Sequence, residues 1–251
     1  MDKAIYIAMT GAKNNTLAQG VHANNLANIS TDGFRRDFVA ARSMGMYYGD
    51  GLPTRAHSMA ESPATDFSVG TLRETGNDLD VAVRGEGWIA VQSPDGREAY
   101  TRAGNLQITP TGNLVTGSGL PVLGNGGPIL LPDAAKIEIG GDGTITLLAM
   151  GQGPDALADV DRIRLVNPAQ ENLSKGRDGL VYYTDPVTGE QRAPVDANVQ
   201  LASGYLEGSN VNSVEAMVDM IELARQYELQ VKLIKTADEN SQSAARLLQI
   251  S

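Results

Sequence analysis

The two ends of the chain constrain its fold most, because both have the periodicity of a helix while residues 35–208 between them do not. The first helix is predicted over residues 3–30, where one face recurs at alternating spacings of four and three residues. We expect it to stop at Thr31-Asp32-Gly33, since glycine can adopt the left-handed conformation that closes a helix. The face consists of Ile5, Met9, Ala12, Thr16, Gln19, Ala23 and Leu26.

A second, longer helix is predicted from about Val214 to Leu248. Asn212 can cap its start, and Glu215 three residues later completes a variant of the capping box. At 1.5 Å per residue this segment forms a rod of about 50 Å, which is too long for one small β domain to cover. Its seam, broken only by Asp238 and Ser241, contains Met217, Met220, Ala224, Tyr227, Val231, Ile234, Ala245 and Leu248.

The middle of the chain has the pattern of strands and turns. Apolar residues alternate with others in Leu79–Val83, and Trp88–Val91 is a second β-prone run. Turn sequences occupy residues 93–96 and 109–113, and residues 137–147 have the pattern of a hairpin around a Gly-rich turn. Turns spaced about 8–12 residues apart are typical of a sandwich or a barrel-like domain.

The fold class predicted from these patterns is α+β, with an all-β body inserted between terminal helices that form a coiled-coil stem. We expect a discontinuous helical stem from residues 1–34 and 209–251, an irregular linker or extended arm over 35–69, and a β-rich outer domain over 70–208. A stem built from both ends of a chain serves assembly more often than catalysis.

Composition excludes several classes of function. The net charge of −10 argues against nucleic acid and anionic lipid as main partners. The chain contains no cysteine, which excludes disulfides and thiol catalysis. No segment has the length and apolarity of a membrane span, and the first residues lack a credible signal-peptide cleavage pattern.

No catalytic, cofactor or metal site is predicted. Residues 85–90 match a dinucleotide fingerprint, but that motif requires a helix after it, whereas a strand is expected here. The two histidines, His22 and His57, accompany no nucleophile motif. Asp142 lies in a Gly-rich turn without the further ligands of a calcium loop.

Three clustered asparagines, Asn24, Asn25 and Asn28, have two possible explanations. Asparagine is a mediocre helix former that is tolerated near a helix end, so the cluster is compatible with ordinary helix termination. Alternatively, the amides bind neighbouring helices in a polymer and fix their register, as a single asparagine does in coiled coils. We favour the second explanation because three asparagines lie together.

These motifs resemble the flagellar rod and hook proteins of bacteria. The N-terminal signature of that family is similar to residues 23–28 with Thr31, Gly33 and Phe34, and its C-terminal signature to residues 204–212 through 217–228. Its entry into the β domain is similar to residues 70–88 and to Tyr100–Asn105, although the family more often has Phe at the position of Trp88. The first six residues and the length are most similar to proximal-rod members, with distal-rod members as the nearest rival.

The resemblance implies a non-enzymatic axial subunit of the flagellar basal body, with no cofactor. It implies copies of itself and neighbouring rod proteins as partners, no membrane insertion, and export by the flagellar type III apparatus without a cleaved signal, to the rod region in the periplasm. The expected assembly interface comprises Asn24, Asn25, Leu26, Asn28, Met217, Met220, Ile221, Ala224, Tyr227, Val231 and Ile234.

A function of a different class stays open on the residues alone. A β-sandwich enzyme or carbohydrate-binding module could also carry a helical oligomerisation stem. A deep pocket with convergent polar groups in the β body would support that alternative.

Overall fold

The computed structural model describes residues 3–39, 41–46, 55–60, 64–149 and 157–249. The chain divides into two compact units, each assembled from segments that are far apart in sequence. Unit 1 comprises residues 1–28, 36–66 and 211–251, and unit 2 comprises residues 29–35 and 67–210.

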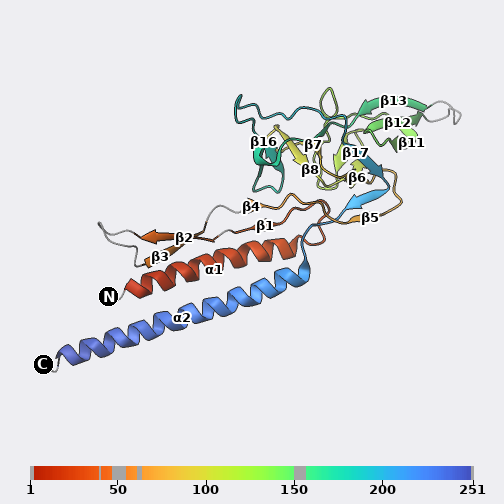
Figure 1. Cartoon of the computed structure of the whole chain (residues 1–251). Helices are drawn as coiled ribbons and strands as arrows, with labels where there is room; N and C mark the ends of the chain where they lie inside the picture. Colours follow the sequence, from red (N-terminus) through yellow and green to blue (C-terminus); the bar gives the residue numbers. More distant parts are fainter. Residues whose placement is uncertain (1–2, 40, 47–54, 61–63, 150–156, 250–251) are drawn as a thin grey trace. The chain divides into compact units, whose positions relative to one another are not determined.

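Unit 1 is built around two helices, α1 (Lys3–Ala27) and α2 (Ser213–Gln249). They lie side by side and antiparallel, and the C-terminal end of α2 runs beyond the start of α1 (Figure 1). The side-chain oxygen of Asn212 accepts hydrogen bonds from the backbone amides of Val214 and Glu215, at 3.1 and 3.4 Å, so the predicted cap of α2 is confirmed. Helix α1 ends three residues before the predicted boundary.

The described residues of unit 1 also form two antiparallel strand pairs, β1 with β4 and β2 with β3. They lie within residues 35–69, which were expected to form an irregular linker or an extended arm. Figure 1 shows the β2–β3 hairpin beside α1. The predicted domain boundaries stay a prediction. The strands are β1 (Asp37–Phe38), β2 (Ala41–Met46), β3 (Arg55–Ala60) and β4 (Ala64–Thr65).

Unit 2 is β-rich, as predicted. A five-stranded sheet has the order β14-β7-β8-β16-β15, a three-stranded sheet has the order β11-β12-β13, and three strand pairs are β9–β10, β6–β17 and β5–β18. Its elements are β5 (Leu72–Glu74), β6 (Val81–Arg84), β7 (Trp88–Gln92), β8 (Glu98–Thr101), β9 (Leu106–Ile108), β10 (Leu114–Thr116), β11 (Ala134–Ile139), β12 (Thr144–Ala149), β13 (Leu157–Arg162), β14 (Leu165–Val166), a 3-10 turn η1 (Gln170–Asn172), β15 (Leu173–Lys175), β16 (Val181–Tyr183), β17 (Gln200–Ser203) and β18 (Tyr205–Glu207).

The predicted turns of unit 2 are confirmed. Residues 93–96 join β7 to β8, residues 109–113 join β9 to β10, and residues 140–143 join β11 to β12. Gly143 adopts a φ of 86°, which only glycine takes without strain. None of the sheets formed by the described strands closes into a barrel. The α+β class, with a β-rich body between two terminal helices, is therefore confirmed.

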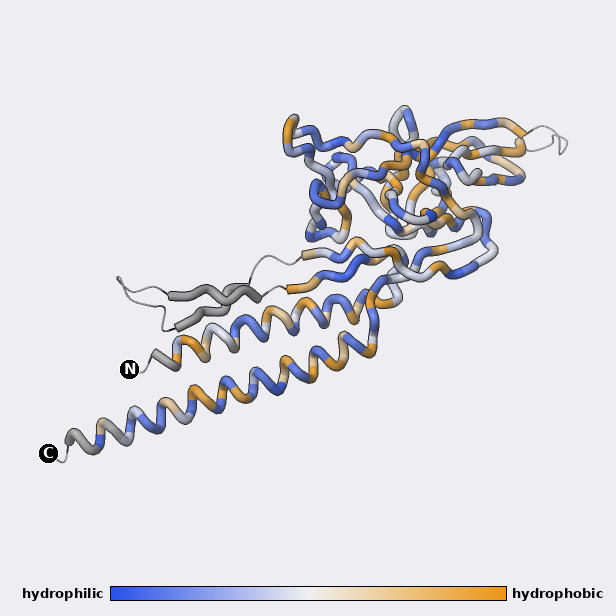
Figure 2. Tube along the Cα trace, viewed as in Figure 1, coloured by the Kyte–Doolittle hydropathy of each residue, from blue (hydrophilic) through white to orange (hydrophobic). Residues whose placement is uncertain are grey.

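The hydrophobic core lies in unit 2. Its larger cluster is formed by aliphatic side chains that include Val81, Ile89, Leu114 and Ile145, each fully buried. Unit 1 differs, because apolar residues are distributed along both helices (Figure 2) while few of the side chains that the structure describes there are buried. Within the described part of the chain, no helix combines the length and apolarity needed to cross a membrane.

Candidate assembly interface

The faces of α1 and α2 that contact each other carry mainly small or polar side chains. On α1 these faces include Gly11, Asn15 and His22, and on α2 they include Asp219 and Gln230. His22 Nδ1 lies 3.7 Å from Asp219 Oδ2. A Cβ atom at Gly11 would lie 2.6 Å from Gln230 Nε2, so glycine is needed for the close approach at this point.

This polar contact is incompletely satisfied. Asn15 Nδ2 and Gln230 Oε1 are buried without a hydrogen-bond partner, and a groove of about 580 Å³ runs between the helices beside them. Unpaired buried amide groups cost free energy that a dry apolar contact would not. Packing between α1 and α2 alone therefore contributes little to the stability of the pair.

Among the side chains that the structure describes, none in unit 1 belongs to a hydrophobic core cluster. Among the residues whose side chains the structure describes, unit 1 buries only Ala12, Asn25 and Ala216. Most helical stability in proteins comes from packing an apolar face against a neighbour. The helices of unit 1 carry such faces, but these faces point outward.

The outward face of α2 carries large apolar side chains over its first turns. Val214, Met217, Val218 and Ile221 follow the spacing i, i+3, i+4, i+7 of one helix face, and all four are at least about half exposed. They lie opposite Ala216 and the other residues that face α1. An exposed apolar stripe of this kind is typical of surfaces that contact a partner.

Most residues of the predicted α2 seam are exposed. Met217, Ile221, Ala224, Tyr227 and Val231 are exposed, and Met220 and Ile234 are half-buried. The face of α2 that contacts α1 is offset from this seam by about one residue, since it contains Ala216, Leu223 and Gln230. The interface role of the seam stays a prediction.

The three clustered asparagines make different contacts in the structure. Asn25 is buried and holds the backbone of Asp37 through two hydrogen bonds, donating from Nδ2 to its carbonyl at 2.6 Å and accepting at Oδ1 from its amide at 3.0 Å. Asn28 Nδ2 donates to the carbonyl of Asn24, which is a local contact at the helix end. Asn24 is exposed and Leu26 half-buried. A role of these residues in a polymer stays a prediction.

Arg36 is a second tie between distant segments of unit 1. Its guanidinium donates to Asp66 Oδ2 at 2.9 Å and to Glu215 Oε2 at 3.2 Å. Hydrogen bonding to Asp66 is the main cause that raises the pKa of Arg36. The pair of contacts joins the extended segment that contains β1 and β4 to the first turn of α2.

A buried charge cluster in unit 2 was not predicted from the sequence. Glu207 is fully buried, and its carboxylate accepts hydrogen bonds from Arg35 Nη2 at 2.5 Å and from Arg102 Nη1 at 2.8 Å. Its Oε1 also accepts from the amide of Gly70 at 2.7 Å. Both guanidinium groups lie over the Trp88 ring, 5.7 and 5.3 Å from its centre. Burial lowers the pKa of Arg102, against the opposing effect of Glu207.

The cluster joins the segments by which the chain enters and leaves unit 2. Arg35 precedes the first exit, Gly70 follows the re-entry, and Glu207 precedes the final exit. The amide of Gly33 donates to the Glu207 carbonyl, and the amide of Asn210 donates to the carbonyl of Phe34. Apart from Arg35, these residues lie in the family signatures identified from the sequence, but their convergence requires the fold.

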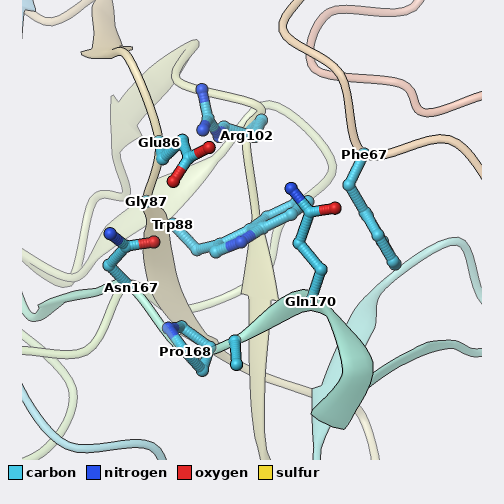
Figure 3. A pocket seen from close by; sticks show the side chains of 9 residues that line it. Phe67, Glu86, Gly87, Trp88, Arg102, Asn167, Pro168 and Gln170 are labelled. Atoms are coloured by element: carbon cyan, nitrogen blue, oxygen red, sulfur yellow. The ribbon is translucent and has the colours of Figure 1, made fainter.

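A pocket of about 300 Å³ adjoins this cluster (Figure 3). Phe67, Glu86, Trp88 and Gln170 line it together with Arg102, Gly87, Asn167, Pro168 and Ala169. Trp88 is only 4% exposed, and the Phe67 ring meets it edge-on with centroids 5.6 Å apart. The indole ring therefore packs against protein groups and offers little surface to a ligand.

The other motifs weighed from the sequence have structural roles. Residues 85–87 are followed by strand β7, so the strand predicted after them is confirmed and the helix that a dinucleotide fingerprint requires does not begin there. Asp142 caps its hairpin by accepting hydrogen bonds from the hydroxyl and the amide of Thr144. His57 falls in β3. Among the described residues, no group of three or more His, Asp or Glu side chains is placed to hold a metal ion.

Three family models match successive parts of the chain. They are described as flagella basal body rod protein (residues 5–35), flagellar hook protein FlgE/F/G D1 domain (residues 82–147) and flagellar basal body rod FlgEFG protein C-terminal (residues 202–247). The model matches thus follow the chain order of the signatures identified in the sequence.

Full-length relatives agree with these matches. The flagellar basal-body rod protein FlgF of Salmonella typhimurium is 44% identical over 253 residues, and that of Escherichia coli is 44% identical over 254 residues, with 100% of each chain covered. FlgG of Buchnera aphidicola from Schizaphis graminum is 32% identical over 98% of this chain and 100% of its own. The chain belongs to the flagellar basal-body rod protein family.

Proposed function

We propose that the chain is a structural subunit of the proximal part of the flagellar rod and that it polymerises through its terminal helices into a helical axial assembly. The observation that carries this proposal is the distribution of side chains on the two helices of unit 1. The helices contact each other through polar groups and expose their large apolar side chains. Burying apolar surface contributes about 25 cal/mol per Å², so contacts with other subunits would stabilise what one chain leaves exposed.

The proposal includes the partners and the location. Copies of the same chain and neighbouring rod proteins would cover the helices, and the subunit would act in the rod within the periplasm after export by the flagellar apparatus without a cleaved signal. The 44% identity to the FlgF relatives, against 32% to the FlgG relative, favours a proximal over a distal position. A net charge of −10 supports partners other than nucleic acid.

We further propose that the chain has no enzymatic activity. The pocket beside Trp88 is the place where a carbohydrate-binding module or an enzyme would be expected, but its aromatic ring is covered by Arg35, Arg102 and Phe67. Stacking on a sugar needs an accessible aromatic face. A glycan screen with the purified chain tests this, and we expect no binding.

A substitution on the outer surface of α2 tests the assembly role. Val231 is 45% exposed, so Val231→Asp should leave the free energy of unfolding within about 0.5 kcal/mol of the wild type. In an assembled rod the same carboxylate would be buried without a partner, at a cost of several kcal/mol. We expect the variant to be absent from purified basal bodies and the cells to lose motility.

Val187→Asp is the matched control, because Val187 is 90% exposed and lies in unit 2, outside the helices. This variant should enter basal bodies as the wild type does. Normal motility with Val231→Asp would contradict an axial interface at this face, and a large loss of monomer stability would place Val231 in a self-contained core.

A further inference from the structure

A tight turn of unit 2 contains the only Asn-Gly pair in the chain, Asn125 and Gly126. The amide of Gly124 donates a hydrogen bond to the carbonyl of Gly127 at 2.7 Å and closes the turn. Asn125 and Gly126 lie between these two residues, and both are exposed. Exposed loop tips are the places where a domain best tolerates a covalent change.

An Asn-Gly pair carries both reacting groups of an intramolecular cyclisation. The backbone nitrogen of the glycine loses its proton to solvent and attacks the side-chain carbonyl carbon of the asparagine, which closes a succinimide ring and releases the side-chain nitrogen as ammonia. Water then adds to either ring carbonyl, and breakage of that carbon–nitrogen bond yields aspartate or isoaspartate. Glycine favours the closure, because it has no Cβ atom to obstruct the approach of the two groups.

The structure leaves both reacting groups of this pair open to solvent. Among the described residues, none forms a hydrogen bond with the Gly126 amide or with the side chain of Asn125. A Cβ atom at Gly126 would meet no atom within 4 Å, so the space around the attacking nitrogen is open. The Gly126 amide is therefore hydrated, and solvent base can remove its proton.

Asp-Gly pairs can form the same ring with loss of water, and the structure holds back four of them. In each of the four, the glycine amide donates a hydrogen bond to a backbone carbonyl at 2.7–3.2 Å. Each of these glycines also has a φ of 71–86°, as in tight turns, whereas Gly126 is not in that region. A fifth pair, Asp50 with Gly51, lies outside the described residues. The four pairs are Asp32–Gly33, Asp95–Gly96, Asp142–Gly143 and Asp178–Gly179.

We propose that Asn125–Gly126 is a site of spontaneous deamidation and isomerisation in the folded chain. The reaction needs water and no enzyme or cofactor. The proposal concerns the covalent chemistry of unit 2 and does not depend on the proposed function.

The modification would change both the charge and the backbone of the turn. Either product places a carboxylate next to an existing one, because the Asp161 carboxylate lies against the backbone of Gly124. Isoaspartate also lengthens the main chain by a methylene group, in a turn whose flanking residues Leu123 and Ile129 are buried. The modified chain should therefore unfold at a lower temperature than the unmodified one.

Ageing of the purified full-length chain tests the proposal. The folded chain is incubated at mildly alkaline pH, and peptide mass spectrometry follows the exchange of side-chain NH2 for OH and the appearance of isoaspartate. We expect at least about tenfold more conversion at Asn125 than at Asn113, which is followed by leucine and whose side chain donates to Thr111 Oγ1. The rate should rise with pH, because the nitrogen attacks after it has lost its proton.

Gly126→Ala is the matched variant, because its methyl group meets no atom of the fold but obstructs the attack. Conversion at Asn125 should become at least about tenfold slower in this variant, and thermal unfolding before incubation confirms that the variant is folded. In urea, isoaspartate should appear at Asp95, Asp142 and Asp178 as well, because unfolding releases their glycine amides.

Three results would overturn the proposal. The first is absence of conversion at Asn125 in the folded wild-type chain. The second is an unchanged rate in folded Gly126→Ala. The third is isoaspartate at the four protected Asp-Gly pairs of the folded chain in amounts equal to that at Asn125, which would show that the hydrogen bonds of the glycine amides do not select the site.

Discussion

Glu207 binds Arg35 and Arg102 in a buried cluster, although these residues are 172 and 105 positions apart from it in the sequence. Arg35 lies in the first of the three regions matched by family models, Arg102 in the second and Glu207 in the third. One carboxylate therefore joins all three regions. Its physical role is to hold together the segments at which the chain enters and leaves unit 2.

Replacing Glu207 by glutamine should destabilise unit 2 strongly. Glu207→Gln keeps the size of the side chain but leaves the charges of Arg35 and Arg102 buried without a counter-ion, at a cost of about 3–5 kcal/mol. Urea unfolding of the purified chain measures the loss. Glu138→Gln is the control, because its pair with Lys136 is exposed to solvent, and its unfolding should be close to that of the wild type. Equal stability of the two variants would contradict the claim that the buried ion cluster stabilises unit 2.

Gly104 should not tolerate a methyl group. A Cβ atom there would lie 1.6 Å from the backbone carbonyl oxygen of Val81, so Gly104→Ala forces two backbone segments apart. We expect a loss of at least about 1–3 kcal/mol in the free energy of unfolding. At Gly126 a Cβ atom would meet no atom within 4 Å, and Gly126→Ala should be close to neutral. If thermal unfolding did not distinguish the two variants, the claim that the Val81 backbone leaves no room for a Cβ atom at Gly104 would be wrong.

Asn25 should act on the backbone of Asp37. Asn25→Ala removes two hydrogen bonds at a buried position, with an expected local loss of about 1–3 kcal/mol. Hydrogen exchange of the Asp37 amide should become faster, while amides in β7 and β8 exchange unchanged. Asn24→Ala, at an exposed position of the same helix, should leave the Asp37 amide protected. A wild-type exchange rate of the Asp37 amide in Asn25→Ala would contradict this role of Asn25.

The carboxyl group of Asp142 should titrate below its ordinary pKa of 3.8, mainly because the Thr144 hydroxyl donates a hydrogen bond to it. A lowered pKa in the folded state contributes stability that is present above the ordinary value and is lost as the pH falls through the folded-state value. NMR titration of the Asp142 carboxyl carbon measures the midpoint. Thr144→Val should move the midpoint upward, whereas Thr146→Val should not, and an unchanged midpoint in Thr144→Val would refute the cause.

The sequence predicted the elements of the fold better than their contacts. The cap at Asn212, the hairpin around Gly143 and the turn at residues 85–87 follow from local chemistry, and the structure contains each of them. The buried ion cluster could not be predicted in the same way. Whether the charge of Glu207 is paired or solvated depends on packing between segments more than a hundred residues apart.

The periodicity of a helix sequence also did not predict which face of α2 contacts α1. Spacings of three and four residues fit adjacent registers almost equally well, so the seam through Met217 and Val231 was predictable, but its orientation relative to α1 was not. Small residues decide the orientation, because Gly11 and Ala216 allow the close approach that larger side chains would prevent. The consequence is that the large apolar residues face outward.

Accessibility of Met217 before and after assembly tests the central claim most directly. Met217→Cys introduces a single thiol at a position that is 50% exposed on the outward face of α2. We predict rapid maleimide labelling of the free subunit and at least tenfold slower labelling of the same variant in purified basal bodies, with a Val187→Cys thiol reacting equally in both. Equal labelling of the Met217→Cys thiol in the two states would contradict burial of this face in the rod.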